Sequence, residues 1–133
     1  MKYRFLPLAI ILTIIVGGCK NKSYDEQCQI EAMKQTSRIC PMQVAEGVTL
    51  DSIVFNRADR SLRYYYLMED TLYTDSAIQE NRDKFREELL KQVNRSLDLK
   101  KAKEHGITFR YIYKANSDKH VALEESFTKE DYQ

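Results

Sequence analysis

The residues of this chain best suited to nucleophilic, redox or metal chemistry are its cysteines and histidines: Cys19, Cys28, Cys40, His105 and His120. Zinc and thiol-redox sites need such residues at short, fixed spacings, and the sequence contains neither a Cys-x-x-Cys nor a His-Glu-x-x-His pair. A catalytic thiol also needs an activating histidine close by in the fold, and the sequence offers no clear candidate. We therefore expect unreactive thiols, surface histidines and no metal site.

Cys28 and Cys40 are the pair that could form a disulfide, provided that the mature chain lies in an oxidising compartment. If both residues belong to one helix, their Cα atoms lie about 18 Å apart, whereas bridged Cα atoms lie roughly 4.4–6.8 Å apart. A bridge would require the helix to end early and the chain to fold back. Geometry therefore disfavours the bridge without excluding it.

Cys19 stands at the end of a segment that has the order of a secretory signal. Lys2 and Arg4 form a basic start, an apolar run from Phe5 to Val16 follows, and small residues precede the cysteine. As a helix, the segment 5–18 would be about 21 Å long, which is short against a hydrocarbon core of roughly 30 Å. Val16-Gly17-Gly18-Cys19 resembles the bacterial lipobox. This resemblance implies cleavage before Cys19, with a diacylglycerol thioether and an N-acyl chain on that residue.

The signal predicts three parts: a lipoprotein signal peptide over residues 1–18, a lipidated tether over 19–22 and a single domain over 23–133. We expect a protein of the bacterial cell envelope that is bound to the lipid bilayer through Cys19, with its domain in the periplasm or at the cell surface. Lys20 follows the lipidated cysteine, and under the sorting rule of enteric bacteria this favours the outer membrane over the inner one. An ordinary cleaved signal or an uncleaved anchor helix is the alternative.

Composition narrows the function further. The chain has 21 basic and 20 acidic residues, and loss of Lys2 and Arg4 with the signal would keep this balance near neutral. A near-neutral domain has no long-range attraction for nucleic acid, so we expect no nucleic-acid partner. The sequence has no glycine-rich phosphate loop and no Gly-x-Ser-x-Gly motif. Adjacent carboxylates such as Glu124 and Glu125 would point to opposite faces of a strand and could not share a site. We therefore expect a non-catalytic protein with no cofactor besides the acyl chains.

The sequence has nine tyrosines and no tryptophan. We expect most of these tyrosines to pack in a sheet or a core, because the ring offers apolar area with a polar tip. Alternation along two predicted strands nevertheless leaves one sheet face with a composition typical of protein interfaces. We expect that face to contact a partner, and it carries Arg63, Tyr65, Leu67, Arg110 and Ile112.

The elements that must position this face follow from periodicity. A capping box at Ser23 predicts a helix over 24–38, which ends before Pro41 and has a thin apolar stripe typical of an outer helix. The runs 48–55 and 61–69 alternate as two strands of a hairpin. The run 107–114 and the strand 120–127 predict a second hairpin, with Val121, Leu123 and Phe127 on one side. Residues 128–133 are polar and should fray.

The strongest predicted element is a long helix over residues 77–98. It begins at a capping box at Ser76, and its apolar stripe is Ile78, Phe85, Leu89, Val93 and Leu97. The predicted order is therefore α-ββ-α-ββ, an α+β domain with a four-stranded twisted sheet of two hairpins. The long helix should pack on the face that carries Tyr64, Tyr66, Phe109, Tyr111 and Leu123.

Four short motifs of the chain resemble an uncharacterised group of small bacterial envelope lipoproteins. They are Cys40-Pro41-Met42, Thr49-Leu50-Asp51-Ser52, Leu62-x-Tyr64-x-Tyr66 and Gly106-Ile107-Thr108-Phe109-x-Tyr111-x-Tyr113. The resemblance implies a small α+β domain and carries no known activity. The first hypothesis is a lipid-anchored, non-catalytic module that binds an envelope protein or polymer. A periplasmic inhibitor or immunity-like module, with a cystatin-like or PepSY-like build by fold analogy, is the second, and a small hydrolase is the third.

Overall fold

The structure is a computed structural model that describes residues 22–133. The predicted signal peptide, the lipidation site Cys19 and most of the predicted tether lie outside the described residues. Within 22–133, no helix has both the length and the apolar composition that would let it cross a membrane.

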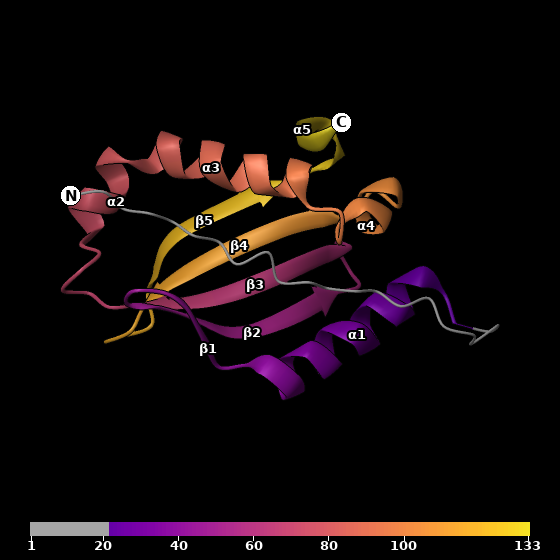
Figure 1. The fold of residues 1–133 in the computed structure, drawn as a ribbon, viewed down its shortest axis with the longest axis horizontal. Helices are drawn as coiled ribbons and strands as arrows, with labels where there is room; N and C mark the ends of the chain where they lie inside the picture. Colours follow the sequence, from indigo (N-terminus) through magenta and orange to yellow (C-terminus); the bar gives the residue numbers. More distant parts are fainter. Residues whose placement is uncertain (1–21) are drawn as a thin grey trace.

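A mixed sheet of five strands forms the centre of the described domain (Figure 1). Its strands lie in the order of the sequence, and β3 pairs with β4 in parallel while the other pairs are antiparallel. The elements are α1 (Tyr24–Ile39), β1 (Met42–Ala45), β2 (Val48–Asn56), β3 (Ser61–Met68), α2 (Asp75–Glu80), α3 (Arg82–Arg95), α4 (Lys100–Glu104), β4 (Thr108–Ala115), β5 (Val121–Phe127) and α5 (Lys129–Tyr132).

The α+β class and both hairpins are as predicted, but the four-stranded sheet and the order α-ββ-α-ββ are wrong. The fifth strand is β1, which pairs antiparallel with the start of β2 through Met42↔Leu50 and Gln43↔Thr49. A β-bulge between Gln43 and Ala45 shortens this pairing. The two predicted hairpins meet through β3 and β4, and the segment 69–107 that joins these parallel strands contains α2, α3 and α4.

Helix α1 begins where its capping residue predicts, because the Ser23 hydroxyl accepts a hydrogen bond from the Glu26 backbone N–H at 3.1 Å. The helix is not peripheral, however, since Cys28, Ala32 and Gln35 are buried against the sheet. Thr36 joins α1 to strand β2 by two hydrogen bonds. The Thr36 hydroxyl accepts from the Ile53 N–H at 2.9 Å and donates to the Ile53 carbonyl at 2.8 Å. The helix thereby satisfies the backbone of β2 beyond the end of β1.

The predicted helix over residues 77–98 is divided into α2 and α3 at Asn81. Thr74, rather than Ser76, caps α2 through a hydrogen bond from the Ala77 N–H at 3.3 Å. The Asn81 side chain donates to the Ala77 carbonyl at 2.8 Å, and Asn81 itself has non-helical backbone angles. The residues of the predicted apolar stripe are buried from Ile78 to Val93, but the last residue of the stripe is not. Leu97 is 85% exposed, because the chain leaves the helix after Arg95.

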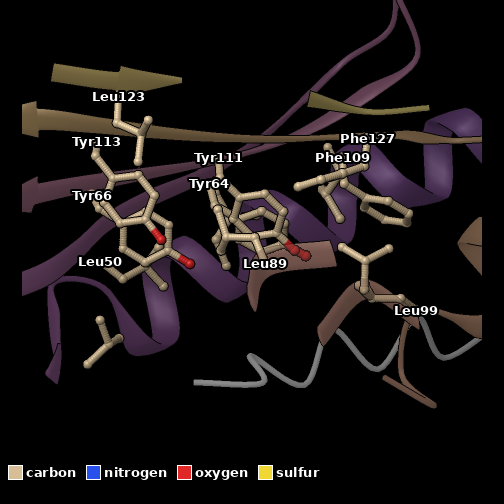
Figure 2. Close-up of a cluster of buried hydrophobic side chains, with 14 of the residues drawn as sticks. Leu50, Tyr64, Tyr66, Leu89, Leu99, Phe109, Tyr111, Tyr113, Leu123 and Phe127 are labelled. Carbon is tan, nitrogen blue, oxygen red and sulfur yellow. The ribbon is translucent and has the colours of Figure 1, made fainter. Parts of the chain in front are cut away.

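Four tyrosines from the two central strands form the middle of the core (Figure 2). Parallel pairing places Tyr64 beside Tyr111 and Tyr66 beside Tyr113, with ring centroids 5.0 Å and 4.6 Å apart and nearly parallel planes. All four rings are buried. The predicted packing of the long helix is confirmed here, because Leu89 of α3 and these tyrosines belong to one core cluster. Such stacked pairs contribute stability beyond their buried area.

Ion pairs and an aromatic contact hold α3 to β5. Arg82 and Arg86 contact the Glu125 carboxylate at 3.4 Å and 2.7 Å, and Glu125 is only 5% exposed. Arg86 also donates to the Ser126 carbonyl and lies over the Phe127 ring. The prediction for Val121 is wrong, because a bulge opposite Lys114 leaves it 52% exposed, apart from Leu123 and Phe127.

The prediction that residues 128–133 fray is wrong. They form α5, whose capping box joins Thr128 and Asp131. The Tyr132 hydroxyl donates to the Ile107 carbonyl at 2.8 Å and anchors the end of the chain to the start of β4. Gly106 lies just before that strand with a φ of +70°, a left-handed conformation that glycine adopts without strain.

Replacing Leu89 by alanine should destabilise the domain by about 2–5 kcal/mol, because the side chain is 1% exposed and its removal leaves a cavity in the core. Leu97→Ala is the matched control, since this leucine is exposed and its loss should cost less than about 0.5 kcal/mol. Urea unfolding of the two variants measures both values. Equal losses would contradict the core described above.

Candidate interaction face

The five residues predicted for the interaction face do lie together on one side of the sheet. Arg63, Tyr65 and Leu67 come from β3, and Arg110 and Ile112 from β4. The parallel register pairs Arg63 with Arg110 and Tyr65 with Ile112. Side chains of paired residues point to the same side of a sheet, and this side is opposite the buried tyrosines. We call these five residues together with Lys114 the open face.

Asp59 joins the two arginines of the open face. Its carboxylate accepts from Arg63 Nη2 at 2.8 Å and lies 3.5 Å from Arg110 Nη2. The Ser61 hydroxyl donates to the other Asp59 oxygen at 2.6 Å and accepts from Arg63 Nε at 3.0 Å. The two guanidinium groups therefore share one carboxylate, and this end of the open face has an excess of positive charge.

The titration of these groups follows from their contacts. Burial alone would raise the pKa of Asp59, but hydrogen bonds from Ser61 and Arg63, with the charge of both arginines, place its pKa below the ordinary value. A hydrogen bond with Tyr65 and then the one with Asp59 raise the pKa of Arg63. Asp59 is therefore ionised and Arg63 protonated at neutral pH.

The rest of the open face is aromatic and aliphatic, with one more cation. Lys114 Nζ lies 5.1 Å from the centre of the Tyr65 ring, within the range of a cation–π contact. Lys114 was missed by the sequence analysis, although it continues the alternation of Arg110 and Ile112. Ile112 is only 5% exposed, so it supports the open face from beneath rather than forming its surface.

The hydrogen bonds of the two arginines differ in a way that bears on binding. Arg63 donates to the Ser61 hydroxyl through Nε and to the Asp59 carboxylate through Nη2. Arg110 has the longer contact to Asp59, and its buried Nε has no hydrogen-bond partner. Its side chain is 34% exposed. Arg110 can therefore donate a hydrogen bond to a further anionic or carbonyl oxygen, as arginine commonly does at interfaces.

Neither of the two cysteines in residues 22–133, Cys28 and Cys40, has the surroundings of a catalytic thiol. Both Cys28 and Cys40 are free, so the disulfide considered above is not present. They lie within α1 and at its C-terminal cap, as the geometric argument against a bridge assumed. Burial raises the pKa of the Cys28 thiol to about 11 and also raises the pKa of Cys40. Protonated thiols are poor nucleophiles and poor metal ligands.

The two histidines join elements at opposite ends of the sheet. The exposed His105 stacks on Tyr24 with ring centroids 3.7 Å apart. His120 lies between Asp118 and Asp75, with nitrogen–oxygen distances of 2.5 Å and 3.1 Å. Hydrogen bonds to Asp118 and then to Asp75 raise the pKa of His120. In residues 22–133, no group of three or more His, Cys, Asp or Glu residues is placed to hold a metal ion.

Comparison with known proteins identifies a family and a fold. Residues 23–123 match the sequence model described as "Domain of unknown function (DUF8479)". A comparison with curated proteins gave no match. The fold is similar to that of a Pseudomonas aeruginosa protein whose secretion is inferred, with a TM-score of 0.67, 13% identity, and coverage of 84% of this chain and 99% of that one. It is also similar to EpsS, a pilotin of the Vibrio vulnificus type 2 secretion system, with a TM-score of 0.50, 10% identity, and coverage of 80% and 88%. At these identities the likeness concerns the fold alone.

The contact of His120 with two carboxylates should make the stability of the domain depend on pH. Because the pKa of His120 is raised on folding, the stabilisation is complete below the unfolded value of about 6.5 and is lost as the pH rises through the folded pKa. The difference in Tm between the wild-type protein and His120→Asn should therefore be larger at acidic than at alkaline pH. It should be small, since the groups are exposed. Thermal melts across this pH range test it, and a constant difference would contradict it.

Proposed function

The chain belongs to the DUF8479 family, and we propose that it is a lipid-anchored protein of the bacterial envelope whose domain binds another envelope component through the open face. The observation that carries the proposal is the parallel register of β3 and β4. It aligns two arginines, a tyrosine and two aliphatic residues on the one side of the central strands that faces away from the core. Arginine and tyrosine side by side are enriched where proteins bind one another.

The lipid anchor is supported by the sequence that precedes the domain. The basic start, the apolar run and the Val16-Gly17-Gly18-Cys19 ending predict cleavage and acylation at Cys19. Helix α1 begins at Tyr24, so the folded domain follows Cys19 after a short tether. The matched family region, 23–123, lies within the predicted domain 23–133 and does not include Cys19. Lys20 favours the outer membrane, as set out above.

The chemistry of the open face suggests the kind of partner. Its cations are Arg63, Arg110 and Lys114, and Asp59 is the anion that the two arginines share. The Arg110 Nε–H has no hydrogen-bond partner in the domain, and Tyr65 and Leu67 add apolar contact area. We propose that the partner is an envelope protein or polymer that presents carboxylate groups. The similar fold of a secretion-system pilotin supports a protein partner by analogy only.

A binding role also accounts for what the site lacks. The open face contains no pair of carboxylates in different environments and no nucleophile beside a base. A shallow hollow on α1 is lined by Met33, Lys34, Ser37 and Arg38, and this lining holds no histidine, cysteine or carboxylate. The proposal therefore assigns the protein no catalytic step.

Replacing Cys19 by serine should abolish acylation and release the protein from the membrane, because the thioether needs the cysteine sulfur. Intact-mass measurement and membrane fractionation of the native and Cys19→Ser proteins give the comparison. The native protein should carry the mass of the acyl chains and sediment with membranes. A native protein without that mass would disprove the lipid anchor.

Replacing Arg110 or Tyr65 by alanine should weaken capture of the envelope partner at least tenfold, the loss expected for a central interface residue. Each variant is used as bait in envelope extract, and the captured proteins and polymers are quantified. Met33→Ala is the matched control, because Met33 is 66% exposed on α1, away from the open face. Unchanged capture by both open-face variants would disprove this role for the face.

A further inference from the structure

The tether between the predicted acyl chains and the fold is short enough to restrict how the domain can sit on a bilayer. Four residues lie between Cys19 and Tyr24, and the five Cα–Cα steps that join them reach about 18 Å in a fully extended chain. Strand β3 has eight residues, which corresponds to about 26 Å from one end of the sheet to the other. The tether is therefore shorter than the domain, and the end of the domain where α1 begins must stay near the lipid surface.

The start of α1 is built into one end of the sheet, which we call the anchor-side pole: the start of α1, turn 57–60, α4 and α5 (Figure 1). Asp25 accepts two hydrogen bonds from Arg60, at 2.8 Å and 2.9 Å. Tyr24 stacks on His105 at the end of α4. The Tyr132 hydroxyl of α5 donates to the Ile107 carbonyl. These contacts make the anchor-side pole one packed unit, so the tether positions the whole of it.

The opposite end, which we call the distal pole, consists of the β1–β2 turn, the loop 69–75 and the turn 116–120 (Figure 1). Ser117 donates to both oxygens of Asp70, at 2.6 Å and 3.1 Å. The Asn116 N–H donates to the Met68 carbonyl at 2.8 Å. His120 Nε2 contacts Asp75. The distal pole is therefore also a packed unit, and strands β3 and β4 run between the two poles.

Charge distinguishes the two poles. Cations at the anchor-side pole that form no salt bridge in the described structure are Lys22, Arg57, Lys100, Lys101, Lys103 and Lys129. Carboxylates there with no salt bridge are Glu26, Glu104 and Glu130, with Asp98 just before α4, so this pole has a small excess of positive charge. The distal pole carries the carboxylates Glu46, Glu69, Asp70, Asp75 and Asp118. It has only Lys119 and His120 to offset them. An anionic bilayer repels the distal pole more strongly than the anchor-side pole.

We infer that the anchor-side pole is a membrane-facing surface, in contact with the headgroups of an anionic bilayer, and that the acidic distal pole points into the aqueous compartment. The inference rests on the proposed function, because it requires acyl chains on Cys19. In this orientation β3 and β4 stand away from the bilayer. Arg63 and Arg110 then lie nearer the lipid and Leu67 and Lys114 further from it, so the open face is accessible from the side.

Amine footprinting of the lipidated protein tests the orientation. The protein is placed in vesicles of phosphatidylethanolamine and phosphatidylglycerol and acetylated, and the labelling rate of each lysine is compared with that in soluble Cys19→Ser protein. Lys22, Lys100 and Lys101 should label severalfold more slowly on vesicles. Lys119 at the distal pole should label at the same rate in both samples. Equal protection of Lys119, or no protection of the three anchor-side lysines, overturns the inference.

A variant with twelve glycine and serine residues inserted between Lys22 and Ser23 is the matched control. The insertion leaves the sequence of residues 23–133 unchanged and adds a flexible span of about 20 Å. Protection of Lys100 and Lys101 should fall towards the soluble value, and persistent protection would overturn the tether as its cause. Intact mass separates this test from that of the proposed function. Missing acyl chains would disprove the anchor, whereas acylated protein with uniform labelling would disprove only the orientation.

Discussion

The parallel pairing of β3 with β4 is the constraint on which both sides of this molecule depend. It brings Tyr64 beside Tyr111 and Tyr66 beside Tyr113 on the buried side, and it brings Arg63 beside Arg110 on the exposed side. Because successive strand residues point to opposite sides, a shift by one residue would exchange the two sets. The burial of the stacked tyrosines is therefore also what specifies the arrangement of the open face.

Much of the fold could be predicted from sequence, because the alternation along β2, β3, β4 and β5 has a clear period of two and Ser23 has a clear capping role. Strand β1 could not, since Met42–Ala45 is four residues long and has only one β-branched residue. The parallel join between the hairpins was also beyond the sequence, because alternation is the same in parallel and antiparallel strands. The break at Asn81 is marked by a side-chain hydrogen bond to the Ala77 carbonyl. It could not be predicted, because the apolar stripe continues on both sides of Asn81.

The sequence was enough to predict which residues belong to the open face, but not how their side chains are arranged on it. Period-two alternation assigns Arg63, Tyr65 and Leu67 to one side of β3, and the same rule assigns Arg110, Ile112 and Lys114 to one side of β4. Side-by-side placement of the two arginines needed the register between strands distant in sequence. Asp59, which accepts from Arg63, belongs to a turn whose conformation no short motif indicates. The burial of Ile112 likewise depends on its neighbours across the sheet.

Helix side chains hydrogen-bond to backbone groups near both long margins of the sheet, on β2 beyond the end of β1 and on β5. Thr36 occupies both hydrogen-bonding groups of Ile53 on β2, and Arg86 occupies the Ser126 carbonyl of β5. An unprotected sheet margin is a template for pairing with another chain, and such pairing leads to aggregation. On the lipid-anchored protein that we propose, this hazard would be acute, because confinement to two dimensions raises the local concentration of like molecules. The helix side chains at these positions thus hinder the strands of one molecule from pairing with those of another in an intermolecular sheet.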